Sequence, residues 1–289
     1  MSGPGWHPVS RAAAWMVGAL LSFTLMALAA RALSAELGTF QILFFRSLIG
    51  LVVIAWLIRR HAPALFRTVQ PGTQLVRNLA HYAGQFGWFY GIAFIPLAEV
   101  FAIEFTVPVW TAICAMLLLG EQLTRARVVT IVLGLAGVLL ILRPGVSVVH
   151  PAALAVLGGA MAYGVAHTLT KKLAARDHAL TILFYMCLIQ LPLGLVPSLF
   201  AWVTPSAALW PALLAVGLTA LSAHYCMTRA LALADATVVV PMDFLRLPLV
   251  ALLGWLFYNE QVAWPLFAGA ALILAGVMWS LKVERARGR

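Results

Sequence analysis

Four ionisable side chains stand inside stretches that are otherwise almost entirely apolar. Glu104 and Arg46 lie in one stretch each, and Asp243 and Arg246 share a third. A charge in a hydrocarbon environment costs at least about 2.5–3.5 kcal/mol, so such groups either serve a function or pair with each other. Glu104 and Asp243 could bind a substrate ammonium group or take up a proton. Asp243 could equally pair with Arg246, which follows three residues later on the same helical face.

The remaining polar groups of these stretches have two interpretations each. Arg46 could attract a substrate carboxylate, but a structural role is favoured, either in a pair or with its head group at the membrane surface. His81 and His224 are each followed by Tyr. A single histidine in a membrane helix is more often a hydrogen-bonding partner for another helix than a ligand. No two histidines have a metal-binding spacing.

An aromatic face accompanies these groups. Tyr82, Gln85, Phe86 and Phe89 are spaced i, i+3, i+4 and i+7, which places them on one side of a helix. Such a stripe more often packs than binds, although the amide of Gln85 favours a binding wall slightly. The candidate substrate-binding residues are therefore His81, Tyr82, Phe86, Glu104, Trp110, Tyr163, His224, Asp243 and Arg246.

The elements that carry these residues are membrane-spanning helices. Of the 289 residues, 63% are apolar and 10% are charged, and the mean hydropathy is +0.99. A soluble chain is about 25% charged, so a soluble enzyme, a disordered segment and a nucleic-acid module are excluded despite the net charge of +10. Apolar runs of about 20 residues span a bilayer. The predicted spans are 12–33, 38–58, 75–95, 98–119, 126–142, 151–171, 179–202, 208–231, 235–257 and 262–281.

Prolines interrupt the same two spans that contain the buried carboxylates. Pro108 lies in the span with Glu104, and Pro241 and Pro248 lie in the span with Asp243. A proline inside a helix removes a backbone hydrogen bond, so freed carbonyls need another partner, such as a neighbour, water or ligand. Broken helices of this kind mark the binding site of many transporters, which makes these two spans the best guide to a site.

The basic residues predict the orientation. If the spans alternate, one side collects fifteen of the nineteen Lys and Arg residues, the other side collects Arg31 and Arg143, and Arg46 and Arg246 lie within the membrane. Cytoplasmic loops are the ones enriched in Lys and Arg, so both termini are predicted to be cytoplasmic.

The two halves of the chain resemble each other. A shift of 139 residues lays "GEQL" at Glu121 on "NEQV" at Glu260, with eight identities between 113–138 and 252–277, and lays Glu104 on Asp243. A shared bias in composition is the alternative explanation. Five spans per half is an odd number, so we expect residues 1–145 and 146–289 to be two five-helix repeats of opposite topology, as in many secondary transporters.

These paired motifs resemble the drug/metabolite transporter superfamily. The segment "YGIAFIPLAEVFAIEFTVPVWTAICAMLLLGEQL" is similar to its ten-helix exporter branch, and the second copy departs by carrying Asp243 and Arg246. Within that branch the chain looks most like bacterial exporters of amino acids, including aromatic ones. The resemblance implies an all-α membrane protein of the inner membrane, with a central cavity lined by spans 1, 3, 4, 6, 8 and 9 and supported by spans 5 and 10.

The repeat thus predicts a secondary transporter, and the resemblance implies that it exports amino acids or related small metabolites with broad specificity. A channel and an intramembrane enzyme are the alternatives. Motifs of metalloproteases, serine hydrolases and nucleotide-binding loops do not occur in the chain, so we expect no enzymatic activity, no cofactor and no metal. The expected partners are a small-molecule substrate and the lipid bilayer, without nucleic acid, and a monomer is the working expectation.

Overall fold

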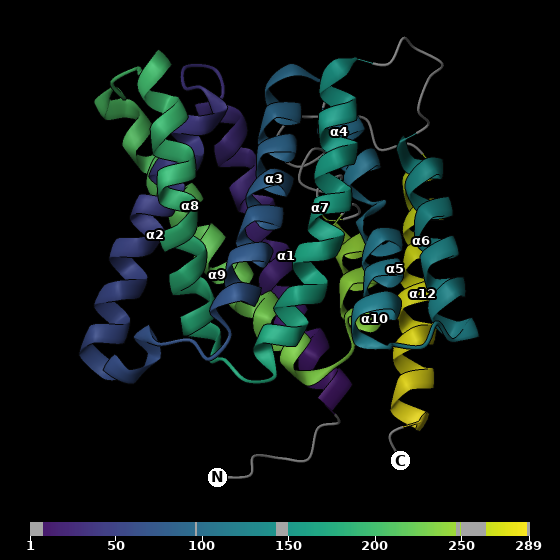
Figure 1. The fold of residues 1–289 in the computed structure, drawn as a ribbon. Coiled ribbons are helices and arrows are strands. Elements are labelled where there is room, and N and C mark those ends of the chain that lie inside the picture. The colour runs from purple at the N-terminus through teal and green to yellow at the C-terminus, as the bar shows by residue number, and fades with distance from the viewer. Residues whose placement is uncertain (1–7, 96, 143–149, 247–248, 250–263, 288–289) are drawn as a thin grey trace.

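The long apolar stretches form helices throughout the part of the chain that the structure describes. The computed structural model describes residues 8–95, 97–142, 150–246, 249 and 264–287, in which no strand occurs (Figure 1). The helices are α1 (Pro8–Leu33), α2 (Thr39–His61), η1 (Pro63–Phe66), α3 (Pro71–Phe94), α4 (Leu97–Glu104), α5 (Val107–Leu119), α6 (Arg125–Leu142), α7 (Pro151–Ala174), α8 (Ala179–Ser198), η2 (Leu199–Ala201), η3 (Ala207–Leu209), α9 (Trp210–Leu233), α10 (Ala236–Val239), η4 (Val240–Leu245) and α12 (Trp264–Arg287).

Five helical segments of the described chain are long and apolar enough to cross a membrane. They are Pro8–Leu33, Thr39–His61, Pro151–Ala174, Ala179–Ala201 and Ala207–Leu233. These segments confirm a helical membrane protein, whereas the number of ten spans and the orientation stay predictions. The first residues of α1 and the last of α12 lie at the same end of the bundle in Figure 1, as an even number of crossings requires.

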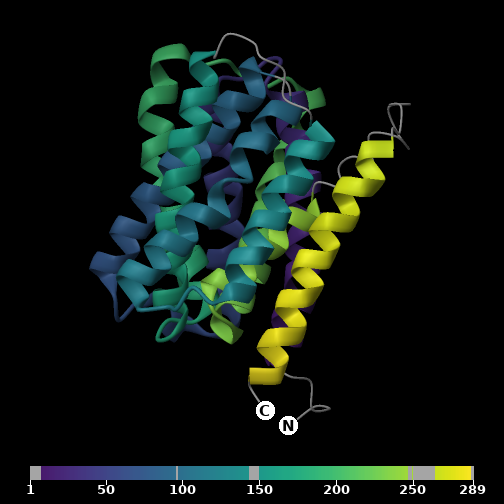
Figure 2. The same ribbon diagram turned by 90° about the vertical axis from the view of Figure 1, so that its right-hand side faces the viewer.

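The helices pack in pairs, and the 139-residue shift between the repeats turns each pair into another pair that is also in contact, or into itself. Helix α1 packs against α9, and its counterpart in the second half, α7, packs against α3, the counterpart of α9. The pairs α2–α8 and α6–α12 each join a helix to its own counterpart. In Figure 1 the α2–α8 pair and the α6–α12 pair lie at opposite edges of the bundle, and Figure 2 shows α12 along one side of it.

Small residues set the separation of α6 and α12. A Cβ atom added to Gly137 would lie 2.6 Å from the carbonyl oxygen of Gly269, so this crossing excludes larger side chains. Thr130 lies beside Gly276 and donates a 3.0 Å hydrogen bond to its carbonyl. The 139-residue shift carries Gly137 onto Gly276 and Thr130 onto Gly269. The contact between Gly137 and Gly269 therefore corresponds to the contact between Gly276 and Thr130.

Two expected spans are broken where prolines predicted it. Helix α4 ends at Glu104 and α5 restarts at Val107 with Pro108 in its first turn, where the missing N–H of proline costs nothing. The ninth span begins with the short α10 and continues as the 3₁₀-helix η4, with Pro241 in the first turn of η4. Pro248 lies outside the described residues, as does the second "NEQV" motif at Glu260. Both breaks lie beside a partly buried carboxylate, Glu104 in the first and Asp243 in the second.

Candidate functional site

A narrow internal cavity lies where the two broken helices meet the central helices. Its volume is ≈ 30 Å³, on the order of one or two water molecules. Its lining residues are Phe23, Met26, Arg46, Gln85, Trp88, Glu104, Phe105, Val107, Pro108, Tyr163, His167, His224, Met227, Val240, Asp243 and Arg246. A metabolite needs more room than this, so the surrounding helices or side chains must move apart before one can bind.

Arg246 joins two partly buried carboxylates, one from each repeat. Its Nη2 atom lies 2.7 Å from Oε1 of Glu104 on α4 and 2.8 Å from Oδ2 of Asp243 on η4. The second oxygen of Glu104 accepts a 2.7 Å hydrogen bond from the indole N–H of Trp88. The side chain of Arg246 is 2% exposed and those of Glu104 and Asp243 are 12% and 17% exposed, so the ion pairs are largely shielded from water. The expected pairing of Asp243 with Arg246 is confirmed, and Arg246 also holds Glu104.

Aromatic rings surround this cation. The guanidinium carbon of Arg246 lies 5.4 Å from the ring centre of Phe23, 5.3 Å from that of Phe101 and 5.7 Å from that of Phe105. Cation–π contacts of this length favour a buried guanidinium. Removing one member of a buried ion pair usually destabilises a protein by about 3–5 kcal/mol, because the remaining charge is left uncompensated. The triad of Glu104, Asp243 and Arg246 therefore fixes the positions of the two broken helices relative to each other.

A chain of amides and imidazoles forms a second polar group. Gln85 accepts a 2.8 Å hydrogen bond from Nη1 of Arg46, and its own amide nitrogen lies 2.5 Å from Nδ1 of His81 and donates to Gln190 at 3.1 Å. The ring of His81 lies 4.5 Å from that of His224. Hydrogen bonds thus connect helices α2, α3 and α8 at the side of the cavity, and a ring contact adds α9.

Only some of the substrate-binding residues that were predicted from the sequence line the cavity. Glu104, Tyr163, His224, Asp243 and Arg246 line the cavity. His81 does not line the cavity, but its ring lies 5.6 Å from that of Tyr163, which does. The hydroxyl of Tyr82 donates to the carbonyl oxygen of Leu193 on α8, and the indole of Trp110 donates to Thr106. The structure brings the charged residues together but leaves part of the aromatic set to packing.

Phe86 lies in a separate pocket. This pocket has a volume of ≈ 410 Å³ and is lined by the α1–α2 connection and one end of α3, with Glu36, Phe40, Phe86, Tyr90 and Phe94 among its residues. Phe86 stacks on Phe40 at 4.7 Å and on Tyr90 at 5.7 Å. The α1–α2 connection, which contributes to the lining of this pocket, lies at the end of the bundle opposite to the beginning of α1 (Figure 1).

Sequence reasoning missed several buried polar residues. Gln190 connects Gln85 and His81, and nothing in the apolar surroundings of a single glutamine marks it as a contact. Arg77, which was counted with the charges of one membrane side, is 2% exposed and donates to Thr170 and Asn78. Arg77 lies two turns into α3, and this placement inside the helix was the available signal. Arg127 is likewise buried, at 5% exposed.

The "GEQL" motif closes one end of the bundle. Gly120 has a positive φ of 68°, a conformation that ends α5 and is suited to glycine, and the chain then turns Glu121 toward the start of α10. Glu121 accepts hydrogen bonds from the backbone N–H groups of Ala236 and Thr237 at 3.0 and 3.1 Å, and from the Thr237 hydroxyl at 2.6 Å. The glutamate therefore satisfies N–H groups that a helix start leaves without partners.

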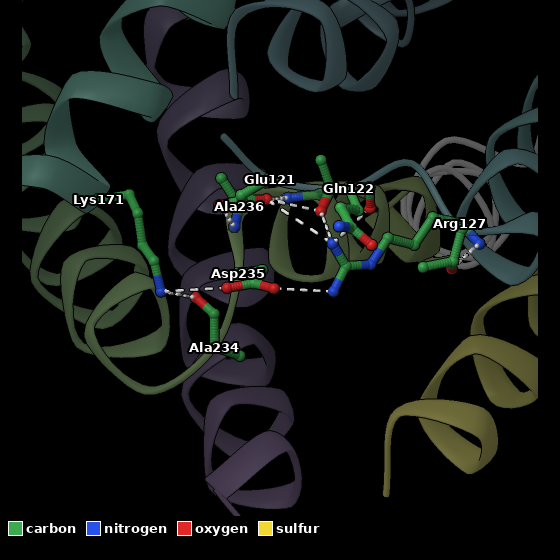
Figure 3. A network of polar contacts seen from close by, with 9 residues as sticks. Glu121, Gln122, Arg127, Lys171, Ala234, Asp235 and Ala236 are labelled. Carbon is green, nitrogen blue, oxygen red and sulfur yellow. Dashed lines mark hydrogen bonds and ion pairs between the residues drawn. The ribbon is translucent and has the colours of Figure 1, made fainter. Parts of the chain in front are cut away.

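Ion pairs extend this arrangement, which Figure 3 shows from close by. Arg127 lies 2.7 Å from a carboxylate oxygen of Asp235, and Lys171 on α7 lies 3.7 Å from the other. Arg127 also donates to the Thr237 hydroxyl at 2.7 Å. We call the set of Glu121, Arg127, Lys171, Asp235 and Thr237 the Glu121 network. It joins the α5–α6 loop, the first turn of α6, the end of α7 and the start of α10.

Comparison with known proteins decides the family. The model of the EamA-like transporter family matches residues 10–143 and again residues 150–282, so two copies of the family's repeat cover most of the chain. The chain belongs to the EamA-like transporter family. It is a multi-pass protein of the bacterial inner membrane and a transporter rather than an enzyme, and the resemblance to the drug/metabolite transporter superfamily is confirmed.

Named relatives of this EamA-like transporter carry different small metabolites. It is 31% identical to a riboflavin transporter of Rhizobium johnstonii over 96% of this chain and 93% of that one. It is 23% identical to an S-adenosylmethionine uptake transporter of Rickettsia prowazekii (94% and 92%) and 31% identical to a pseudopaline exporter of Pseudomonas aeruginosa (89% and 90%). A solved crystal structure with 20% identity has a TM-score of 0.81 and covers 97% of this chain and 99% of that one, which supports the fold. The EamA-like protein is therefore a small-metabolite transporter.

Proposed function

We propose that this EamA-like transporter exports amino acids or related small metabolites from the bacterial cytoplasm with broad specificity. It does so by alternating access around the cavity between two inverted repeats, residues 1–145 and 146–289. The observation that carries the proposal is the triad at the cavity, where Arg246 holds Glu104 and Asp243 at the breaks of the two symmetry-related helices. Both carboxylates can accept an ammonium group, and the cavity's aromatic rings can pack against varied side chains.

Alternating access is supported by the packing of the helices. The pairs α1–α9 and α3–α7 exchange under the repeat, as do the α6–α12 contacts, so two equivalent arrangements of the bundle are available. A cavity of ≈ 30 Å³ cannot hold a metabolite unless the bundle rearranges. Rocking of one repeat against the other around a fixed site would supply this room.

The Glu121 network gives the two ends of the bundle different closing contacts. The 139-residue shift carries Arg127 onto Leu266, Asp235 onto Pro96 and Thr237 onto Ala98. The ionic contacts of Arg127 with Asp235 therefore have no counterpart in the sequence of the other repeat. In the predicted orientation the network lies at the cytoplasmic end, and access from the cytoplasm requires that it open.

Export and amino-acid specificity follow from the resemblance to bacterial amino-acid exporters and from the relative named as an exporter. Other relatives are named for uptake, and several are named for riboflavin. Riboflavin is accordingly the second candidate substrate. The indole of Trp88 and the ring of Tyr163 at the cavity could stack on its planar ring system.

Counterflow in proteoliposomes tests the proposal. Vesicles that contain the purified protein are preloaded with each standard amino acid or with riboflavin, and entry of the labelled compound is measured with and without a pH gradient. We expect counterflow of several amino acids. Counterflow of riboflavin alone would favour the second candidate, and hydrolysis of a lipid or peptide without any counterflow would exclude a transporter.

Variants locate the site. Glu104→Gln and Tyr163→Ala alter residues that line the cavity, whereas Trp279→Ala alters an exposed residue of α12. Loss of a substrate contact that contributes about 1.4 kcal/mol weakens binding tenfold, so we expect about tenfold weaker transport for the cavity variants and no change for Trp279→Ala. Only variants that elute as monodisperse protein are compared. Normal transport by both cavity variants would place the site elsewhere.

A further inference from the structure

Arg46 has unused hydrogen-bonding capacity at the cavity. It lies in the first half of α2, is 3% exposed and belongs to the cavity lining. Its Nη1 atom donates to Gln85 at 2.8 Å, but Nε and Nη2 are buried and have no hydrogen-bond partner among the residues that the structure describes. Buried guanidinium donors are normally paired, so this arrangement requires a physical explanation.

The charge of Arg46 is not compensated either. Within the described part of the chain no Asp or Glu oxygen lies within 4.0 Å of it, whereas Arg246 contacts both Glu104 and Asp243. Gln85 offers only a neutral carbonyl oxygen. A buried cation without a counter-ion is unfavourable, and an anion bound beside it would remove that cost.

Arg77 provides a contrast within the same bundle. It is also a buried arginine, at 2% exposed, but its side chain donates to Thr170 at 2.9 Å and to Asn78 at 2.7 Å. None of its nitrogen atoms is buried without a partner, and it does not line the cavity. Burial of an arginine alone therefore does not explain the unpaired donors of Arg46.

Other unpartnered polar atoms face the same cavity. His167 on α7 lines it, and its Nδ1 atom has no partner within the described ranges. Asp243 lines it from η4, and its Oδ1 atom is also without a partner there. Nε of Arg246 is a further unpartnered donor there, but the charge of Arg246 is already paired with Glu104 and Asp243. The cavity thus offers the free donors of an uncompensated cation on α2 and a free acceptor from η4, which together suit a ligand with separate negative and positive groups.

We propose that Arg46 binds the carboxylate of the transported substrate, through the N–H groups on Nε and Nη2. The proposal rests on the proposed function and adds the substrate class: compounds with a free carboxylate, above all zwitterionic amino acids, whose ammonium group would approach Oδ1 of Asp243. The side-by-side Nε and Nη2 donors of an arginine match the two oxygens of a carboxylate. Neutral compounds such as riboflavin leave the charge of Arg46 uncompensated and are poor substrates.

The experiment compares acids with their amides. Counterflow is measured for each standard amino acid and, for those that move, for the corresponding amino-acid amide, which keeps the side chain and the ammonium group but lacks the negative charge. The variants are Arg46→Gln, Arg46→Lys and the matched control Arg77→Gln. Thermal unfolding of each purified variant is recorded with L-phenylalanine, with L-phenylalaninamide and with sodium chloride at the same concentration.

We expect the wild type to prefer acid over amide by about tenfold or more. Arg46→Gln should lose this preference, Arg46→Lys should keep part of it, and Arg77→Gln should keep all of it. Without ligand, Arg46→Gln should unfold at the same or a higher temperature than the wild type, because an unpaired charge is removed, and Arg77→Gln should unfold at a lower one.

Equal transport of acids and amides by the wild type would overturn the assignment of Arg46 while leaving the proposed function intact. Counterflow of no amino acid would overturn both. If Arg46→Gln unfolds as early as Arg77→Gln and keeps the preference for acids, Arg46 is structural. Stabilisation of the wild type by chloride to the same extent as by L-phenylalanine would mean that the site takes an inorganic anion.

Discussion

Replacing Glu121 by Gln should open the end of the bundle that the Glu121 network closes. The carboxylate is 7% exposed and accepts three hydrogen bonds from Ala236 and Thr237. A glutamine keeps one oxygen, so its NH₂ group must face at least one of these N–H or O–H donors. Hydrogen bonds to charged groups contribute about 1.5–3 kcal/mol each. If these bonds exist only in the closed state, the ratio of open to closed protein rises by about 10- to 100-fold.

Accessibility of a buried cysteine measures this ratio. Val240 lines the cavity and is 1% exposed, so Val240→Cys reports access from outside the protein. The native Cys114, Cys187 and Cys226 are first replaced by Ala. A membrane-impermeant maleimide is added to either side of oriented vesicles, and the initial labelling rate is recorded. Glu121→Gln should raise the rate by about 10- to 100-fold from the cytoplasmic side only.

The matched control is Glu36→Gln, which alters an exposed glutamate in the α1–α2 connection. It should leave the labelling of Val240→Cys unchanged. An unchanged rate in Glu121→Gln, or an equal rise in both variants, would refute the view that the Glu121 network holds this end closed. A rise from the opposite side only would refute the predicted orientation instead.

Two further outcomes are expected. In a cysteine-free background, a reagent added from outside should modify Gln261→Cys but not Thr124→Cys, and the reverse or equal labelling would contradict the inverted repeats. Gly137→Val should lower the thermal unfolding temperature by several degrees, because even its Cβ atom would lie 2.6 Å from the Gly269 carbonyl and overpacking costs about 1–3 kcal/mol. The control is Leu139→Val, which alters an exposed residue of the same helix. An equal fall in the unfolding temperature of the control would mean that the α6–α12 crossing is not the cause.

The positions of the helix breaks could be predicted because they depend on local chemistry. Pro108 and Pro241 lack the N–H that a helix interior requires, which favours a place in the first turn of a new segment, and both lie there. The preference is not absolute, since Pro192 and Pro197 lie inside α8. The pairing of Asp243 with Arg246 is equally local, since three residues separate them. In contrast, the hydrogen bonds of Glu121 with the start of α10 join residues more than a hundred positions apart.

The sequence by itself determined that the chain is a helical membrane protein with a twofold internal repeat, because hydrophobicity and repeated motifs are written along the chain. Only the tertiary structure decided which polar residues meet. Glu104 meets Arg246, and Arg46 meets Gln85 while two of its donors stay free, because helix packing brings these faces together. Phe86 directly follows Gln85 in α3 yet lies in another pocket, because consecutive residues of a helix point about 100° apart and so contact different neighbours.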